Sequence, residues 1–337
     1  MKRWSGLAAV PGMIVLGAAF FSCRKAPAYT VLQGEIFHTY YHIKYKGEAD
    51  HSQRVDSVFR AFSHSLNPFD STSIIAGVNR NLPVRTDSMF RRVFRRAQEI
   101  AAVSGGSYDI TCSPLINAWG FGFEHKEDVT AQLIDSIKAF VGYRRVRLDG
   151  ETVVKDDPRI TLNTSSIAKG YASDLVGEAL AAHGIGDYMV EIGGEVAFNG
   201  LNPQGKPWRI GVSKPQDDSL GLAMQEFELV VELSGKGGLA TSGNYRNFYV
   251  RDGKKYAHTI NPLSGYPVQT DVLSATVIAP DCMTADALAT TFMVVGSERV
   301  PAIAAKFSGV DYMLILSDGG GSYKTVMNEG FRKRVAK

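Results

Sequence analysis

Asp286 and Thr290 are the two side chains in this sequence best suited to bind a metal ion together. They are four residues apart in a segment where apolar residues recur at helical spacing, so both oxygens project from one helix face. A carboxylate beside a hydroxyl can hold a hard cation such as Mg²⁺, which prefers oxygen ligands. The alternative is structural: Asp286 complements the helix dipole and Thr290 hydrogen-bonds back to the main chain.

The helix that carries this pair is expected to begin at Thr284 and to end at Gly296. Thr284 follows a break at Pro280-Asp281, and its hydroxyl can cap an amide of the first turn. Glycine commonly terminates helices, which fits Gly296. A strand over residues 274–278 leads into this helix.

A second segment whose side chains could bind a ligand covers residues 163–174, where serines precede Lys169 in the first turns of an expected helix. Free amides, the helix dipole and an ammonium group can together bind phosphate. The segment lacks the Gly-x-x-x-x-Gly-Lys-Ser/Thr pattern of a P-loop. The next strand, residues 188–192, enters Gly193-Gly194-Glu195, which lacks the Gly-x-Gly-x-x-Gly pattern of a Rossmann nucleotide site.

The elements that must position these segments are predicted from apolar periodicity and turn residues. Residues 108–122 are rich in aromatic residues and glycine without a clear period, which is typical of a ligand-pocket wall or of a packed connector. The glycines of 235–245 allow either a close backbone approach to a ligand or a mobile turn. We expect helices over 55–66, 90–100 and 297–307, and strands over 36–45, 145–148, 152–154, 159–162, 208–212, 227–233, 247–251, 255–260, 312–316 and 323–327.

Composition narrows the class of protein. The 337 residues carry a net charge of +3, and several of the positive charges lie near the N-terminus, so the folded body is close to neutral. Nucleic acid is therefore not expected as a partner. No repeat and no clear linker divides the chain. Cys112 and Cys282 are expected to be buried free thiols, although the spacing leaves a disulfide open.

The N-terminus has the pattern of an export signal. Lys2 and Arg3 precede an apolar run over residues 7–21, and a small residue then precedes Cys23. The run is too short, and too broken by Pro11, to make a good membrane span. The cysteine position resembles a bacterial lipobox, in which the cysteine is lipidated. The alternative is an ordinary signal peptide with an incidental cysteine.

Four segments in order resemble one family, the FAD:protein FMN transferases or ApbE-like flavin transferases. Each motif is weak alone, but their order and spacing fit over most of the chain after residue 30. The segments are Asp109-Ile110-Thr111 with Trp119-Gly120-Phe121-Gly122, Ile167-Ala168-Lys169-Gly170-Tyr171-Ala172, Ser242-Gly243-Asn244-Tyr245 with His258-Thr259-Ile260-Asn261-Pro262, and Thr284-Ala285-Asp286-Ala287-Leu288-Ala289-Thr290.

This resemblance implies binding of FAD with Mg²⁺ and transfer of FMN onto a Ser or Thr hydroxyl of an acceptor protein, with release of AMP. Asp286 and Thr290 match the family's metal ligands, and Ser166 matches a position that contributes its backbone carbonyl. Positions that contact FAD in the family fall at Phe37, Phe69, Asp109, Lys169 and Ile260. Phe37 replaces a usual methionine and Phe69 a frequent tyrosine, so an apolar or aromatic face is kept.

The fold expected with this activity is α+β, mostly antiparallel sheet with flanking helices, and an FAD cleft between subdomains. We divide the chain into a lipoprotein signal peptide (1–22), a lipidated tether (23–30) and a transferase domain (31–337). The expected location is the bacterial cell envelope, lipid-anchored and facing the periplasm, with an acceptor flavoprotein there.

Two questions stay open at this level. His258 is the best candidate to take the proton from the acceptor hydroxyl, because imidazole can accept a proton near neutral pH; Asp286 is the other candidate. The function itself has two alternatives, a Mg²⁺-dependent FAD pyrophosphatase giving FMN and AMP, and a non-catalytic FAD-binding lipoprotein.

Overall fold

The computed structural model describes residues 28–121, 129–214, 227–244, 248–251, 254–257, 259–319 and 322–337, and for 248–251 and 254–257 it describes the backbone alone. The predicted signal peptide, most of the predicted tether and the candidate base His258 lie outside these ranges. The first strand begins at Tyr29, two residues before the expected start of the folded domain.

The described residues form an α+β fold, as expected. The helices are α1 (Ser52–Leu66), α2 (Ile74–Asn79), α3 (Ser88–Val103), α4 (Ser113–Ala118), α5 (Ala131–Lys138), a 3₁₀ turn (Tyr143–Arg145), α6 (Ala168–Ala181), α7 (Cys282–Val295), α8 (Val300–Ala304) and α9 (Glu329–Arg332). The strands are β1 (Tyr29–Ile36), β2 (Thr39–Lys46), β3 (Val146–Asp149), β4 (Thr152–Lys155), β5 (Tyr188–Ile192), β6 (Glu195–Asn199), β7 (Trp208–Ser213), β8 (Phe227–Leu233), β9 (Gly237–Gly243), β10 (Phe248–Arg251), β11 (Lys254–Ala257), β12 (Val272–Ala279), β13 (Asp311–Ser317) and β14 (Tyr323–Met327).

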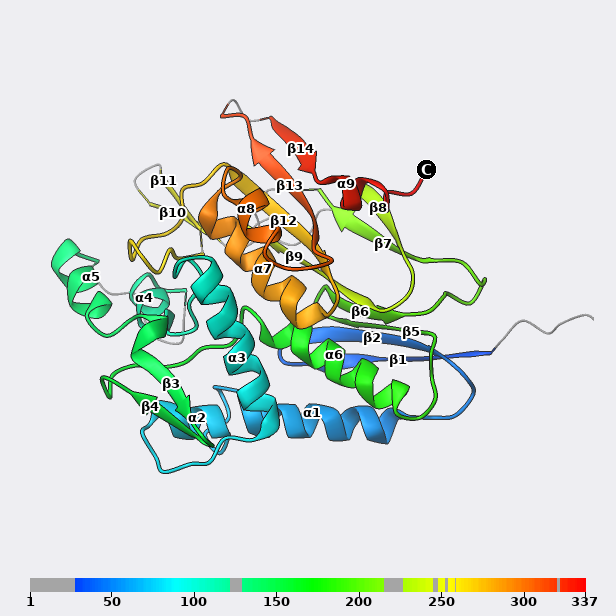
Figure 1. Cartoon of the computed structure of the whole chain (residues 1–337), viewed down its shortest axis with the longest axis horizontal. Helices are drawn as coiled ribbons and strands as arrows, with labels where there is room; N and C mark the ends of the chain where they lie inside the picture. Colours follow the sequence, from blue (N-terminus) through cyan, green and yellow to red (C-terminus); the bar gives the residue numbers. More distant parts are fainter. Residues whose placement is uncertain are drawn as a thin grey trace, which may run out of the picture.

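One antiparallel sheet organises the molecule (Figure 1). Within the described residues it has eight strands in the order β1-β2-β5-β6-β9-β12-β13-β14. The alternation of side chains along each strand gives the sheet two different faces. In β5, for example, Tyr188, Val190 and Ile192 are buried on the face that the helices cover.

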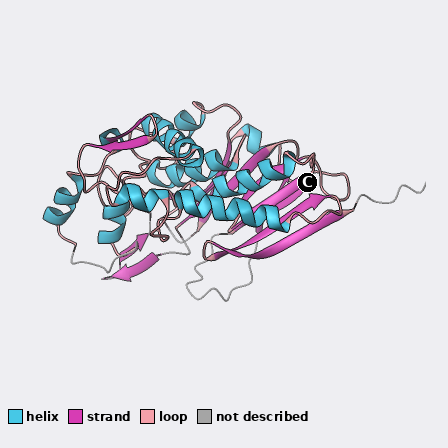
Figure 2. Cartoon of the chain, turned by 90° about the horizontal axis from the view of Figure 1, so that it is seen from below, coloured by secondary structure: helices cyan, strands magenta, loops and turns pink. Residues whose placement is uncertain are grey.

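Helices cover one face of this sheet and a two-stranded ribbon covers the other. Figure 2 shows the helices gathered along one side of the strands, with α6 and α7 packed against the central strands and against each other. On the opposite face, Trp208 and Leu233 of the β7–β8 ribbon pack in a second apolar cluster with Met313 of β13. The sheet is therefore buried on both faces near its centre.

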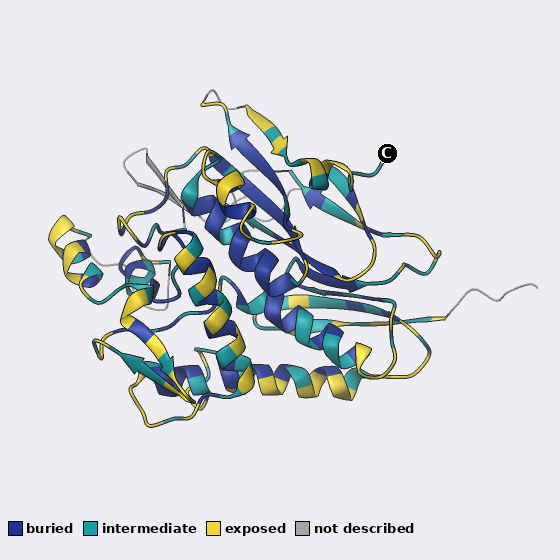
Figure 3. Ribbon diagram, in the orientation of Figure 1, coloured by how far each residue is buried: buried dark blue, intermediate teal, exposed yellow. Residues whose placement is uncertain are grey.

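Helix α7 is the most deeply buried helix near the site (Figure 3). It begins earlier than the sequence predicts. The expected cap at Thr284 is wrong: Asp281 is the N-cap, and its carboxylate accepts hydrogen bonds from the amide and hydroxyl of Thr284 at 2.8 and 2.7 Å. A carboxylate outcompetes a hydroxyl here because it also complements the positive end of the helix dipole. The end at Gly296 is confirmed by its position as C-cap.

The glycine-rich segment over 235–245 is a strand for most of its length, not a turn. Strand β9 lies beside β12, and a Cβ atom at Gly238 would stand 2.2 Å from the Cα atom of Cys282. Glycine therefore lets the strand pass directly against the first turn of α7. The close backbone approach at Gly238 is therefore to a helix of the protein itself, and neither of the two alternatives for this segment, approach to a ligand or a mobile turn, describes it.

Two further strand predictions need correction. The strand expected over 36–45 is confirmed from Thr39 onward as β2, but its start is wrong, because Phe37 and His38 adopt positive φ values of 52° and 59° and reverse the chain between β1 and β2. Residues 159–162 are not a strand, although Ile160 and Leu162 are buried in the main core. Apolar alternation there reflects packing of an extended connector and not sheet pairing.

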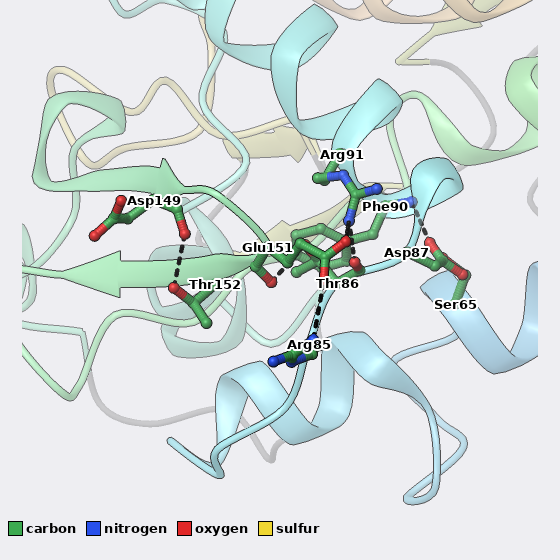
Figure 4. Close-up of polar contacts among 9 residues, drawn as sticks. All are labelled: Ser65, Arg85, Thr86, Asp87, Phe90, Arg91, Asp149, Glu151 and Thr152. Atoms are coloured by element: carbon green, nitrogen blue, oxygen red, sulfur yellow. Dashed lines mark hydrogen bonds and ion pairs between the residues drawn. The ribbon is translucent and has the colours of Figure 1, made fainter.

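The N-terminal end of α3 is held by contacts with the turn between β3 and β4. Figure 4 shows the segment before α3 against the β3–β4 turn, where the amide of Thr86 donates to the carbonyl of Glu151 at 2.7 Å. Arg91 also pairs with the Glu151 carboxylate at 3.3 Å. Asp87 caps α3 by accepting from the amide of Phe90 at 2.7 Å.

None of the helices in the described ranges combines the length and apolarity needed to cross a bilayer.

Candidate active site

A cavity of about 960 Å³ opens where the helical layer meets the sheet. Among the residues that line it are seven of those predicted from the sequence, brought together from five separate stretches of chain: Phe69, Asp109, Ser166, Lys169, Ile260, Asp286 and Thr290. A cavity of this size with a few convergent polar groups is typical of a ligand site.

Phe37 is the described member of the predicted set that does not line the cavity. Its ring packs on Phe59 and Phe62, with ring-centroid distances of 5.8 and 4.9 Å. Phe37 is thus half-buried against the main core, and contact with FAD stays a prediction for this residue.

The carboxylate of Asp286 is buried, and one of its oxygens is fixed by the neighbouring helix. Its Oδ2 atom accepts a hydrogen bond from the amide of Gly170 at 3.0 Å. Burial raises the pKa of Asp286, while the charge of Lys169 and the Gly170 amide oppose that rise. No residue in the described part of the chain donates a hydrogen bond to Oδ1, so this oxygen is available to a ligand.

The amide that fixes this carboxylate comes from the first turn of α6. Ile167 is the N-cap of α6, so the amide of Gly170 has no partner within the helix and donates to Asp286 instead. Ser166 precedes this N-cap, and over the described ranges no hydrogen bond reaches its carbonyl. A Cβ atom at position 170 would stand 2.3 Å from the carbonyl oxygen of Cys282, so glycine is required for this approach of α6 to α7.

Thr290 presents its hydroxyl one turn beyond Asp286. Along α7, every residue from Cys282 to Val294 is buried except Thr290, which lines the cavity. Its hydroxyl lies 3.3 Å from that of Ser242 on β9. The prediction that Asp286 and Thr290 share one face is confirmed.

The chemistry of this donor set fits magnesium. It offers a carboxylate, a hydroxyl and the Ser166 carbonyl, all of them hard oxygen ligands. The described residues contain no cluster of three or more His, Cys, Asp or Glu side chains that could form a closed metal site. A cation held by Asp286, Thr290 and Ser166 would therefore keep positions open for phosphate oxygens and water.

Lys169 supplies the positive side chain of the cavity. Its ammonium lies 2.7 Å from Oε1 of Glu195, the first residue of β6. Burial lowers the pKa of Lys169, but the charges of Asp286 and Glu195 outweigh that effect and the net shift is upward. The ammonium is therefore positively charged at neutral pH.

Asp109 and Ile260 line the cavity but are also held by their own surroundings. Asp109 accepts hydrogen bonds from Thr111 and, at 2.6 Å, from the amide of Tyr143, while burial raises its pKa. Ile260 packs in an apolar cluster with Trp119, whose indole N–H donates to the carbonyl of Gly265 at 2.8 Å. Trp119 thus packs against Ile260 on the side away from the cavity and supports the part of the cavity wall that Ile260 forms.

Two of the residues that the sequence analysis did not single out line the same cavity. The buried phenol of Tyr108 accepts a hydrogen bond from the hydroxyl of Ser166 at 3.0 Å. Glu195 follows the Gly193-Gly194 turn, and only the three-dimensional structure shows that it meets Lys169. The sequence does contain one signal for Glu195: an acidic residue stands at the start of a strand whose other residues are mostly apolar.

Asp174 joins the two helices of the site outside the cavity. From α6 it accepts hydrogen bonds from the amides of Cys282 and Met283 at 2.9 and 2.8 Å, the first amides of α7. Burial and the nearby Asp281 raise the pKa of Asp174 to about 7, against the lowering effect of those amides. This contact keeps Lys169 and Asp286 in a fixed relation.

A cavity that combines buried carboxylates, a lysine and oxygen ligands suited to a hard cation fits an enzyme that acts on phosphate groups. The ApbE family model matches residues 37–314, and the chain belongs to that family.

Named relatives agree with this assignment. The chain is 34% identical over 348 residues to the FAD:protein FMN transferase of Vibrio cholerae, with all of both chains covered. It is 32% identical to the enzyme of that name from Haemophilus influenzae, with 98% of each chain covered. Among solved structures, the Vibrio cholerae flavin transferase ApbE superimposes with a TM-score of 0.80, covering 91% of this chain and 99% of that one at 33% identity. The apo flavinyl transferase ApbE of Pseudomonas stutzeri also gives a TM-score of 0.80, at 31% identity, covering 91% and 97%.

Proposed function

We propose that this protein transfers FMN from FAD to a Ser or Thr hydroxyl of an acceptor protein and releases AMP. The relatives that carry the name FAD:protein FMN transferase support this proposal over nearly the full length of the chain. The observation that carries it is the convergence of Asp286, Thr290, Ser166 and Lys169 on one cavity.

Asp286, Thr290 and the Ser166 carbonyl would hold a Mg²⁺ ion. When bound, that ion would neutralise negative charge on the diphosphate of FAD, whose cleavage requires such neutralisation. Gly170 fixes the Asp286 carboxylate through Oδ2 and leaves Oδ1 directed to the ligand. The protein thus prepares the site through its main chain as well as through side chains.

Lys169 places a second positive charge beside the diphosphate. A fixed ammonium in a partly desolvated site stabilises the charge that develops on the phosphate oxygens, and its geometry is set before the substrate arrives. The acceptor hydroxyl must reach the phosphorus through the open side of the cavity and lose its proton. His258 or Asp286 would take that proton; the neighbouring Thr259 and Ile260 line the cavity.

We place the protein in the bacterial cell envelope, anchored by a lipid on Cys23, with its catalytic domain facing the periplasm. The charged start, the apolar run and the cysteine position in the sequence support this location. The acceptor would then be a flavoprotein of the same compartment that presents a Ser or Thr in an accessible segment.

The test is a reconstitution with the purified chain, FAD, Mg²⁺ and acceptor proteins from the same cell envelope. Intact-mass spectrometry should show an acceptor heavier by one FMN phosphoester, with an equal amount of AMP. If FMN accumulates free at a rate that the acceptor does not change, the protein is a pyrophosphatase. If FAD binds without any turnover, the protein is a flavin-binding lipoprotein.

A further inference from the structure

Glu195 is a buried acid whose position in the cavity is not explained by packing. Its side chain is 6% exposed, and one oxygen, Oε1, lies 2.7 Å from the ammonium of Lys169. The other oxygen, Oε2, is buried and has no hydrogen-bond partner among the described residues. A buried carboxylate with an unpartnered oxygen costs stability, so its presence here points to a role in the site.

The surrounding backbone fixes the direction of both members of this pair. Gly193, at φ 62°, passes close to the lysine stem: a Cβ atom there would stand 3.4 Å from Cδ of Lys169. The hydroxyl of Ser173, one turn beyond Lys169 on α6, donates to the carbonyl of Glu195 at 3.1 Å. The helix that carries the lysine thus also anchors the strand that carries the acid.

Lys169 has two carboxylates within its electrostatic reach, and it pairs with only one of them in the described structure. The charges of Asp286 and Glu195 both raise the pKa of the lysine, so both act on it. Direct ion pairing, however, is made with Glu195. An ammonium that paired directly with Asp286 would compete with a cation for the free Oδ1 oxygen.

We propose that Glu195 is a positioning residue: it holds the ammonium of Lys169 away from Asp286, so that Asp286 stays free to bind the cation and Lys169 faces the diphosphate. This inference rests on the proposed function for the identity of the cation and of the diphosphate. It assigns to Glu195 an action through Lys169 and no contact with the reacting atoms.

The proposal predicts a specific effect of removing the charge of Glu195. In Glu195→Gln, which keeps the size of the side chain, the lysine loses its anionic partner and turns to Asp286. Binding of Mg²⁺ should then weaken about tenfold, a coupling typical of charges that share one small site. In Glu195→Asp, which keeps the charge on a side chain shorter by one methylene, part of the affinity should return.

A double-mutant cycle separates this action from a merely structural one. Mg²⁺ binding is measured by calorimetry, without FAD, for the unmodified protein, Glu195→Gln, Lys169→Met and the double variant. If Glu195 acts through Lys169, Glu195→Gln weakens binding about tenfold when the lysine is present and less than twofold when it is methionine. Equal weakening in both backgrounds, or none in either, overturns the proposal.

A matched control and a parallel assay complete the experiment. Glu178 lies on α6 outside the cavity, where its carboxylate pairs with Arg92 at 2.8 Å, so Glu178→Gln should leave Mg²⁺ binding unchanged. Thermal unfolding of each variant confirms that it folds. Flavin transfer by the unmodified protein is measured alongside: its absence would count against the proposed function, whereas an additive cycle in an active protein counts against the role of Glu195 alone.

Discussion

The amide of Gly170 on α6 donates to Oδ2 of Asp286 on α7 at 3.0 Å, and this bond orients the carboxylate that we propose as a cation ligand. The carbonyl of Ser166, just before the N-cap of α6, has no hydrogen-bond partner in the described ranges. The proposed cation site therefore lies at the junction of two helices, and changes at that junction should affect activity even where they touch no substrate.

Neighbouring threonines on α7 provide the first prediction. Thr290→Val removes a hydroxyl that lines the cavity and should lower the rate of flavin transfer about 10²-fold, roughly the loss expected when one stabilising ligand is removed. Thr291→Val is the matched control, because that hydroxyl is buried and donates to the carbonyl of Ala287 at 2.7 Å. It should cost about 1 kcal/mol of stability and little activity. Steady-state rates and urea unfolding of both variants check this; equal rates in the two would contradict it.

A second prediction concerns the close approach of α6 and α7 at Gly170. Gly170→Ala places a methyl group where the Cys282 carbonyl stands, so the helices must separate, at a cost of about 1–3 kcal/mol. The rate of flavin transfer should fall together with the free energy of unfolding, because the Asp286 carboxylate loses its hydrogen bond from the Gly170 amide. Gly186→Ala is the control, since its Cβ would meet nothing within 4 Å. Thermal unfolding and rate measurements test the pair, and an unaffected Gly170→Ala protein would refute the account of this contact.

The third prediction is a pH dependence of stability set by Asp174. The folded pKa of Asp174 is about 7, above the ordinary 3.8, so between those values the folded protein holds a proton that the unfolded chain has lost. Stability from this group is fully present below about pH 4 and is lost as the pH rises through 7, by up to about 1.4 kcal/mol per pH unit.

Asp174→Asn removes this titration. Urea unfolding between pH 5 and 7.5 should then show a shallower loss of stability with rising pH than the unmodified protein shows. The variant should also be less stable overall at pH 5, because an amide oxygen replaces a group that accepts from both Cys282 and Met283. An unchanged slope would mean that Asp174 does not titrate in this range.

The fourth prediction follows from the oxygen-only donor set. Treatment with a chelator should abolish transfer, and Mg²⁺ should restore it, while Zn²⁺ should restore it poorly because the proposed ligands are a carboxylate, a hydroxyl and a carbonyl and include no histidine or thiolate. The protein should remain folded without metal, since the core around α7 is apolar and closed. Circular dichroism before and after chelation measures this. Full activity in the metal-free protein would contradict it.

Much of the site was predictable because its residues lie at fixed local spacing. Asp286 and Thr290 are four apart on one helix, and that spacing alone indicates a shared face. Lys169 was found in the same way, from its place in the first turn of α6. Local rules failed where two interactions compete, as at the start of α7, where Asp281 caps the helix in place of Thr284.

The remaining parts depend on contacts between distant segments. The pairing of Glu195 with Lys169 joins β6 to α6, and no periodicity in either segment indicates it. The hairpin turn at Phe37 and His38 was missed because apolar alternation continues across it and neither residue is a usual turn former. For the glycines of 235–245, the sequence leaves approach to a ligand or a mobile turn open, and only the structure shows that Gly238 packs against the first turn of α7.

The most direct test of the central claim is intact-mass analysis of an acceptor protein incubated with FAD, Mg²⁺ and either the unmodified chain or Asp286→Asn. We predict that the unmodified chain adds one FMN phosphoester and releases one AMP, and that Asp286→Asn does so at least 10²-fold more slowly while still folded. Equal rates of FMN addition by the two proteins would contradict the claim that Asp286 holds the catalytic cation.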